Sequence, residues 1–352
     1  MRHRQHLPTV ALLVGFVVDI VLFKTINLSY AQLILATHLS IVALCILVLA
    51  LPSEAKGQSL FSWAQGWLPL LQQYSTGNLL SAFLVLYSGS GSLSQSWPFF
   101  ALLGIAVVGN EVFARERSRL AFHTSLLFFN LLLFFALALP LMTGTISVLA
   151  FILAIVAGTV VFQIFRWSLR LIARDTYQAN RPVINRGALF VLVSLTVLYF
   201  TNLIPPLPLT LKDVGYFHGV SRVGDTYVVA DEVRPWYDRF FDLGGTTVRL
   251  SPGESLYVYS AVFAPAHLDT EIVHRWEYFN EGSSAWESHN VVRMSIEGGR
   301  DGGWRTYSLV RDPAEGRWRV SVETTRGAVI GHAYATVTQP AKTVQLVEVV
   351  KK

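Results

Sequence analysis

The chain has 352 residues, of which 52% are hydrophobic and only 14% are charged, and its mean hydropathy is +0.45. Soluble domains usually carry about 25% charged residues, so the composition excludes a protein that is soluble throughout. The part up to Pro205 has twelve Lys and Arg against five Asp and Glu, and the rest has sixteen against eighteen. The net charge of +5 therefore belongs to the loops of the apolar half. It does not indicate a nucleic-acid surface, and no nucleic-acid partner is expected.

Apolar runs that are long enough to cross a bilayer fill the first 205 residues. A bilayer requires about 20 apolar residues per helix, and the sequence predicts about seven transmembrane helices. They are Leu7–Leu28, Tyr30–Leu51, Trp67–Tyr87, Trp97–Phe113, Leu120–Leu141, Thr145–Phe165 and Gly187–Ile204. The first is interpreted as a membrane helix rather than a cleaved signal peptide, because it lacks a small-residue cleavage site. The third and fourth are the weakest, and this pair could instead be one re-entrant hairpin.

Basic residues predict the orientation of these spans, because cytoplasmic loops are rich in Lys and Arg. They gather at the N-terminus and in the segments after the fourth and sixth spans, namely Arg2, Arg4, Arg115, Arg117, Arg119, Arg166, Arg170, Arg174, Arg181 and Arg186. The intervening loops 88–96 and 142–144 carry no charge. With seven spans, the N-terminus is cytoplasmic and the C-terminal domain is extracytoplasmic. In a Gram-negative bacterium this means an inner-membrane protein with a periplasmic domain.

One carboxylate lies in the middle of an expected span. Asp19 and His38 are about equally far from the tight turn between the first two spans, so they are expected at similar depth on adjacent helices. An intramembrane carboxylate is costly unless it is paired. The two side chains are therefore predicted to form a polar pair, which either locks the helix hairpin or relays a proton or ion. Lys24 is an alternative partner for Asp19.

The pattern changes after Pro205-Pro206 to short alternating segments of β-branched and aromatic residues separated by Gly, Pro and Asp. This is typical of an all-β, immunoglobulin-like antiparallel sandwich. The expected strands are Tyr227–Ala230, Thr246–Leu250, Ser255–Phe263, Glu271–Phe279, Val291–Ile296, Trp304–Val310, Trp318–Glu323 and Gly331–Thr338. The expected divisions are a polytopic transmembrane domain (1–205), a juxtamembrane connector that is a stalk or extra strands (206–252), the extracytoplasmic sandwich (253–340) and a C-terminal tail (341–352). The only cysteine, Cys45, lies in the apolar half, so the sandwich is expected to fold without disulfides.

Three motifs within the sandwich carry a family resemblance. They are the HRWEY run from His274, the WRTYS run from Trp304 and the GRWRV run from Gly316, followed by a closing strand at Ile330-Gly331. In this order they resemble the bacterial family of domain of unknown function 2914. The resemblance covers residues 254–338 and implies a small β-domain that is often attached to membrane segments. It implies no activity and no catalytic residues.

Alternation along the strands places the tryptophans of these motifs on one face and the arginines on the other. One interpretation is a core of tryptophans with arginines paired to Glu277 and Glu323 on the solvated face. The other is that Arg275, Arg305 and Arg319 line one sheet as an anion-binding strip, with aromatic side chains such as Tyr307 beside them. Arginine recognises carboxylate and phosphate through paired hydrogen bonds.

No catalytic, metal-binding or cofactor-binding signature is present in the sequence, so no metal and no cofactor are expected. The favoured hypothesis is a bacterial inner-membrane protein that displays a binding module for an envelope protein, a glycan or a lipid headgroup. Its membrane helices would lie in the lipid bilayer and could also form a homo-oligomer. The alternative is a transporter or channel that uses the Asp19–His38 pair and has a regulatory exported domain. The favoured hypothesis is non-enzymatic. Enzymatic activity stays open as a further alternative, because intramembrane active sites often lack a linear motif.

Overall fold

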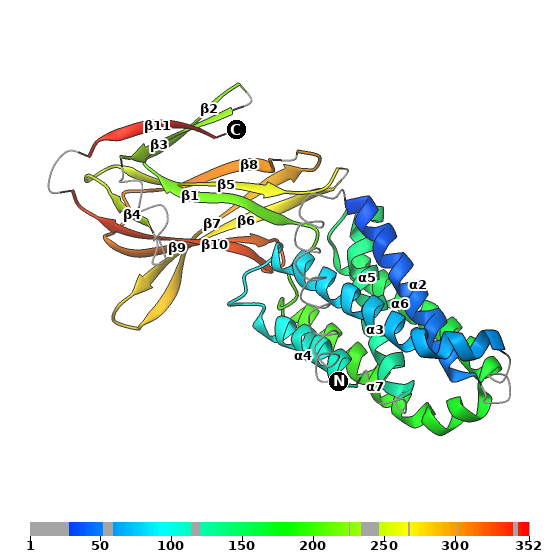
Figure 1. Ribbon diagram of the computed structural model, residues 1–352. Coiled ribbons are helices and arrows are strands. Elements are labelled where there is room, and N and C mark those ends of the chain that lie inside the picture. Colours follow the sequence, from blue (N-terminus) through cyan, green and yellow to red (C-terminus); the bar gives the residue numbers. More distant parts are fainter. Residues whose placement is uncertain are drawn as a thin grey trace, which may run out of the picture. The chain divides into compact units, whose positions relative to one another are not determined.

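A computed structural model describes residues 28–51, 59–113, 120–224, 226–233, 246–266, 268–300, 302–340 and 344–351. The chain divides into two compact units. The helical unit comprises Met1–Ser88 and Ser96–Leu207, and the β unit comprises Gly89–Gln95 and Pro208–Lys352. Figure 1 shows the helices and strands of the two units.

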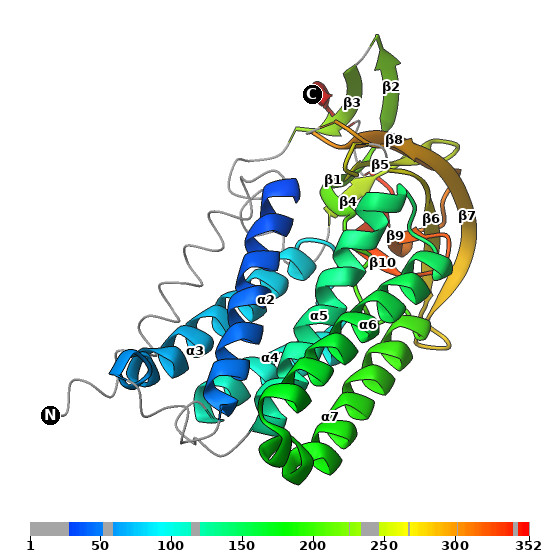
Figure 2. The same ribbon diagram turned by 90° about the vertical axis from the view of Figure 1, so that its right-hand side faces the viewer.

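Six helices form the described part of the helical unit, compared with the expected seven or so. They are α2 (Leu28–Ala50), α3 (Ser59–Ser88), α4 (Trp97–Phe113), α5 (Leu120–Thr143), α6 (Val148–Ile172) and α7 (Arg174–Phe200). The first expected span, Leu7–Leu28, lies almost entirely outside the described residues. Helices α5, α6 and α7 run side by side (Figure 2).

The helices α6 and α7 are longer than the apolar segments that predicted them. The expected basic loop after the sixth span is not a loop: Arg166 and Arg170 lie in the last turns of α6, and Arg174, Arg181 and Arg186 lie in the first half of α7. Arginine is a good helix former, so both helices continue beyond the apolar segments.

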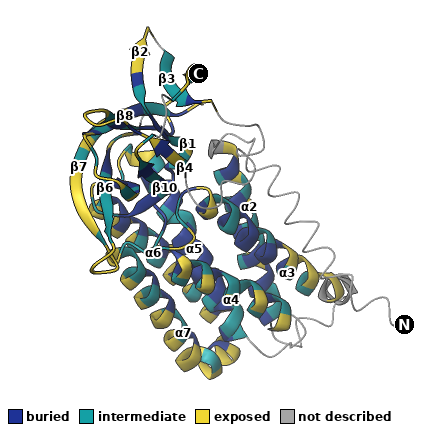
Figure 3. Ribbon diagram, turned by 90° about the vertical axis from the view of Figure 1, so that its left-hand side faces the viewer, coloured by how far each residue is buried: buried dark blue, intermediate teal, exposed yellow. Residues whose placement is uncertain are grey.

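Apolar side chains cover much of the outer surface of these helices as well as their interior. On α6, for example, Leu149, Ile152 and Ile164 are exposed while Phe162 and Leu169 are buried. Figure 3 shows exposed residues along the outer faces of α6 and α7. Within the described part of the chain, four helices are long and apolar enough to cross a membrane, namely Tyr30–Ala50, Leu120–Thr143, Val148–Ile172 and Arg174–Phe200. A helix that is apolar all round is typical of a membrane span, so the unit has the properties of a membrane-embedded bundle.

Eleven described strands form three sheets in the β unit. They are β1 (Thr210–Phe217), β2 (Gly219–Val223), β3 (Thr226–Glu232), β4 (Thr246–Arg249), β5 (Ser255–Phe263), β6 (Asp269–Asn280), β7 (Ala285–Glu297), β8 (Trp304–Arg311), β9 (Gly316–Thr324), β10 (Val329–Thr338) and β11 (Leu346–Lys351). The strand orders are β1-β5-β8, β4-β10-β9-β6-β7 and β11-β3-β2.

The first two sheets share one core. Residues of β5 and β8, including Leu256, Val258 and Val310, pack with Trp276 of β6 and Trp318 of β9 in a single buried cluster. The indole rings of the two tryptophans meet edge to face with centroids 6.3 Å apart. The interpretation of these two tryptophans as core residues is confirmed.

The β unit departs from a purely antiparallel sandwich in two ways. Strand β4 pairs with β10 in parallel. In addition, β3 pairs with β2 and with the C-terminal strand β11 in a third sheet. Residues of the expected connector therefore form the regular strands β1, β2 and β3, and residues of the expected tail form β11. Phe217, Val220 and Val229 pack on Tyr259 in a second cluster, and this burial explains why weakly alternating segments become strands.

Candidate functional site

The outer face of the five-stranded sheet carries the ionisable residues of the family motifs. Strands β6, β9 and β10 are paired so that Arg275, Ser321 and His332 lie in one row across the sheet. The next row contains Glu277, Arg319 and Tyr334. Because side chains alternate along a strand, these rows share the face opposite Trp276 and Trp318.

Two ion pairs lie on this face of the sheet. Arg319 donates from Nε and Nη2 to the two carboxylate oxygens of Glu277, at 2.8 and 2.7 Å. Arg275 donates only from Nε to Glu323, at 3.1 and 3.2 Å from the two carboxylate oxygens. The expected pairing of these arginines with Glu277 and Glu323 is therefore present. Each pair is partly buried, so it is screened less by solvent than a surface pair is.

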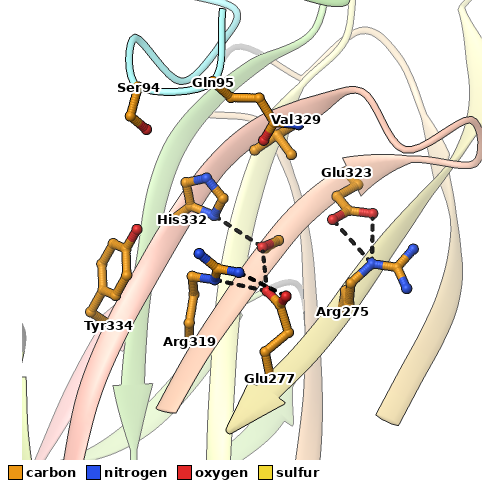
Figure 4. A pocket seen from close by; sticks show the side chains of 10 residues that line it. Ser94, Gln95, Arg275, Glu277, Arg319, Glu323, Val329, His332 and Tyr334 are labelled. Carbon is orange, nitrogen blue, oxygen red and sulfur yellow. Dashed lines mark hydrogen bonds and ion pairs between the residues drawn. The ribbon is translucent and has the colours of Figure 1, made fainter. Parts of the chain in front are cut away.

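A groove with a volume of about 440 Å³ lies over these rows. Its walls come from the sheet and from the segment Gly89–Gln95, which belongs to the same compact unit. The lining residues are Ser94, Gln95, Arg275, Glu277, Arg319, Ser321, Glu323, Val329, His332 and Tyr334. Figure 4 shows the ion pairs on the floor of the groove, with His332 and Tyr334 beside them. A concave site with several convergent polar groups is the usual form of a small-ligand site.

The protonation states in the groove follow from burial and neighbouring charges. Burial, with a further contribution from the charge of Arg319, lowers the pKa of His332 to about 4. The ring is therefore neutral near pH 7. Burial raises the pKa of Glu323, and Arg275 opposes that shift. Burial also acts to raise the pKa of Glu277, but the hydrogen bonds and charge of Arg319 outweigh it and leave this pKa below its ordinary value.

A hydrogen-bond chain fixes which nitrogen of His332 carries the proton. The Ser321 hydroxyl donates to Glu277 Oε2 at 3.0 Å and lies 3.0 Å from His332 Nδ1. A hydroxyl has one proton to donate, so Nδ1 of the neutral ring must donate to Ser321. The Nε2 atom of His332 is then a hydrogen-bond acceptor, on a ring that lines the groove.

The expected arginine strip is not formed, because its three members lie on two different sheets. Arg275 and Arg319 belong to the five-stranded sheet, whereas Arg305 and Tyr307 lie on β8 of the three-stranded sheet. Tyr227 of β3 donates its hydroxyl to the backbone oxygen of Arg305 at 3.2 Å and packs edge-on against Tyr307. The sequence gives the face of each strand but not the sheet to which the strand belongs.

A buried polar cluster, which the sequence did not predict, lies between the two sheets. His274 Nε2 is 2.8 Å from Ser260 Oγ and its Nδ1 is 2.9 Å from Ser308 Oγ, while the Trp276 indole donates to the same Ser308 oxygen at 2.9 Å. Ser260 Oγ also lies 3.0 Å from Thr306 Oγ1. Burial lowers the pKa of His274 to about 3. The available signal was the alternation along β8, where Thr306 and Ser308 are buried and Tyr307 between them is exposed.

Asp19, one member of the predicted intramembrane pair, lies outside the described residues. His38 lies in α2, with its ring edge-on to Tyr74 of α3 at a centroid distance of 6.2 Å. Among the described residues, its Nδ1 atom is buried without a hydrogen-bond partner. The pairing of Asp19 with His38 stays a prediction.

The chain combines apolar helices with an all-β unit. This arrangement is consistent with the class of membrane proteins that carry a β domain. Residues 269–337 match the family model described as "Protein of unknown function (DUF2914)", which confirms the resemblance drawn from the motifs around His274, Trp304 and Trp318. No curated protein matches the chain. Among solved structures, the Pseudomonas fluorescens alkylpurine DNA glycosylase AlkC bound to DNA containing an abasic site analog shows 13% identity. That match covers 89% of this chain and 99% of the glycosylase with a TM-score of 0.19, which is too low for an argument about fold or function.

Proposed function

We propose that the chain is a bacterial inner-membrane protein whose extracytoplasmic β unit binds a ligand of the cell envelope in the groove over β6, β9 and β10. The observation that carries this proposal is the convergence of Arg275, His332 and Tyr334 on one concave surface. The helical unit holds this module at the membrane. Within the described residues, no group of three or more His, Cys, Asp or Glu is arranged to hold a metal ion, and the chemistry of the groove is that of recognition.

The groove suits a polar ligand with one apolar face. Guanidinium donors, a histidine acceptor and a tyrosine ring lie within one space of about 440 Å³. Tyrosine supplies a rigid surface that is apolar over the ring and polar at its tip. The site therefore favours a glycan or a polar headgroup over an apolar molecule.

The test is retention of a ligand by the full-length protein purified in mild detergent from its native host, measured by native mass spectrometry. Tyr334→Ala is expected to lose the retained species, because it removes the exposed ring of the groove. Tyr307→Ala is the matched comparison, since the two side chains are 42% and 41% exposed but lie on different sheets. Retention by Tyr334→Ala together with loss by Tyr307→Ala would place the site on the three-stranded sheet and overturn the proposal.

A second candidate function is transport, with the β unit as a regulatory domain. It is favoured by buried polar atoms without hydrogen-bond partners among the described helices, namely His38 Nδ1, Gln72 Nε2, Ser75 Oγ and Asn110 Oδ1. Such atoms are costly in an apolar environment, and they mark polar positions inside the bundle. The test is proton-coupled flux in proteoliposomes, which Asp19→Asn and His38→Phe are each expected to abolish. Equal flux in the parent and both variants would exclude this candidate.

A further inference from the structure

The two arginines of the groove differ in how much of each guanidinium is already used. Arg319 forms a two-point bond with Glu277 through Nε and Nη2, and its guanidinium stacks over the Trp286 ring with its Cζ atom 4.6 Å from the ring centroid. Its position is fixed by these two neighbours. Arg319 is thus a framework residue that holds the floor of the groove.

Arg275 is held from one side only. Its Nε atom contacts Glu323, and among the described residues neither Nη1 nor Nη2 has a hydrogen-bond partner. The Arg275 side chain is 37% exposed, whereas the Glu323 side chain is 8% exposed. Figure 4 shows the terminal nitrogens of Arg275 directed away from Glu323. The carboxylate of Glu323 therefore orients a guanidinium fork that is still open.

We propose that the groove recognises an acidic sugar, with the ring carboxylate on the Nη1 and Nη2 atoms of Arg275 and a ring hydroxyl on Nε2 of His332. This inference deepens the proposed function and rests on it. A planar carboxylate matches the two parallel N–H bonds that an arginine fork offers. The neutral His332 ring accepts from a hydroxyl because its Nδ1 proton is committed to Ser321. Tyr334 provides the apolar surface for the face of the sugar ring.

The charge of the groove favours a singly charged acid over a phosphate. Arg275 and Arg319 are balanced by Glu277 and Glu323, so the lining has no excess positive charge. A dianionic phosphate on the open fork would lie near the Glu323 carboxylate and would be repelled. A sugar acid brings one negative charge, and its hydroxyls use the neutral donors and acceptors of the groove.

The probes for the test are D-glucuronate, neutral D-glucose and inorganic phosphate. Binding to the full-length protein in lipid nanodiscs is measured by saturation-transfer NMR. Glucuronate is expected to bind more tightly than glucose or phosphate. Arg275→Lys keeps a positive charge beside Glu323 but removes the fork, and it is expected to weaken glucuronate binding by about 10- to 100-fold, since a charged hydrogen bond contributes on that order. Glucose binding should stay unchanged in this variant.

Arg317→Lys is the matched control. Arg317 lies on the neighbouring strand β9, its side chain is 49% exposed, and it pairs with Glu281 outside the groove. This variant should bind glucuronate like the parent. Glu323→Gln is the second test, and it does not depend on the folding of Arg275→Lys. It preserves an acceptor for Arg275 Nε, removes the nearby negative charge and should strengthen glucuronate binding.

The outcomes separate the two proposals. If a sugar binds and Tyr334→Ala abolishes binding, but Arg275→Lys and Glu323→Gln both leave glucuronate unaffected, the groove is a binding site and the acidic-sugar assignment is wrong. If phosphate binds more tightly than glucuronate, the assignment is also wrong. If no probe binds and the purified protein retains no ligand that depends on Tyr334, both proposals fail. A glucuronosyl lipid in the nanodisc, tested against soluble glucuronate, distinguishes a lipid headgroup from a free glycan as the source.

Discussion

Acid should destabilise the β unit through His274, and the size of the effect follows from its environment. The ring is fully buried between two sheets, and its pKa is lowered from 6.5 to about 3. Between these values the unfolded chain binds one more proton than the folded chain, so the free energy of unfolding falls as pH falls. This stability is fully present above about pH 6.5 and is lost progressively toward about pH 3. The slope is about 1.4 kcal/mol per pH unit for one histidine.

The perturbation is His274→Gln, which keeps one donor and one acceptor for Ser260 and Ser308 but does not titrate. From about pH 6.5 to about pH 4.5 the parent should lose about 3 kcal/mol through His274 alone. His332, with its pKa lowered to about 4, adds a loss of the same sign in both proteins. Glu323, with its raised pKa, opposes it in both. These contributions cancel in the comparison, so the variant should show a slope that is shallower by about 1.4 kcal/mol per pH unit.

The assay is urea unfolding of the full-length protein in detergent at about pH 7 and about pH 4.5. Unfolding is followed by pulsed hydrogen exchange of peptides from β6 and β9, so that the readout reports the β unit alone. His289→Gln is the control, because His289 is exposed on β7, and it should follow the parent. The reasoning is refuted if His274→Gln and the parent lose stability with the same slope.

Three further predictions concern packing and topology. Ser308→Ala leaves the buried indole N–H of Trp276 without an acceptor. It should lower the free energy of unfolding by about 1–3 kcal/mol in the urea assay. Gly298→Ala places a Cβ against the backbone oxygen of Pro265, so the β unit should not fold and should be degraded by limited proteolysis. In a Cys45→Ser background, Ser283→Cys places the only thiol in the exposed β6–β7 turn. It should react with a membrane-impermeant maleimide in intact spheroplasts if this turn is extracytoplasmic.

The two packing predictions each have a matched comparison. Ser221→Ala changes an exposed serine on β2 and should leave the urea midpoint unchanged. Gly219→Ala introduces a Cβ at an ordinary contact distance of 3.6 Å and should fold. Resistance of Gly298→Ala to protease would contradict the predicted clash. Labelling of Ser283→Cys only after permeabilisation would reverse the assigned orientation.

The local pattern of the sequence predicts individual strands well, but it predicts poorly which strands pair with one another. Alternation placed β5 at its observed limits and set Trp276 and Trp318 on the core face, because burial of one face is a local property of a strand. Strands β1, β2 and β11 were not predicted as such. Strands β1 and β11 each pair with a segment distant in the sequence, and β2 and β11 are largely exposed, so neither shows a clear buried face. In the β11–β3 pair, for example, Val349 lies directly opposite Val229, although most of the sequence of the β unit separates the two residues. Such a pairing leaves no signal in either segment alone.

The observed positions of Arg275, Arg305 and Arg319 show why a site is harder to predict than a fold. All three occupy outward positions of alternating strands, and the sequence gives no reason to separate them. The strand order places Arg305 on a different sheet from the other two arginines. Register then divides the remaining two, because Glu277 lies directly across from Arg319 and satisfies its fork. Arg275 lies across from Ser321 and meets Glu323 only diagonally, through Nε. The open fork of Arg275 is therefore a consequence of which residue stands opposite it.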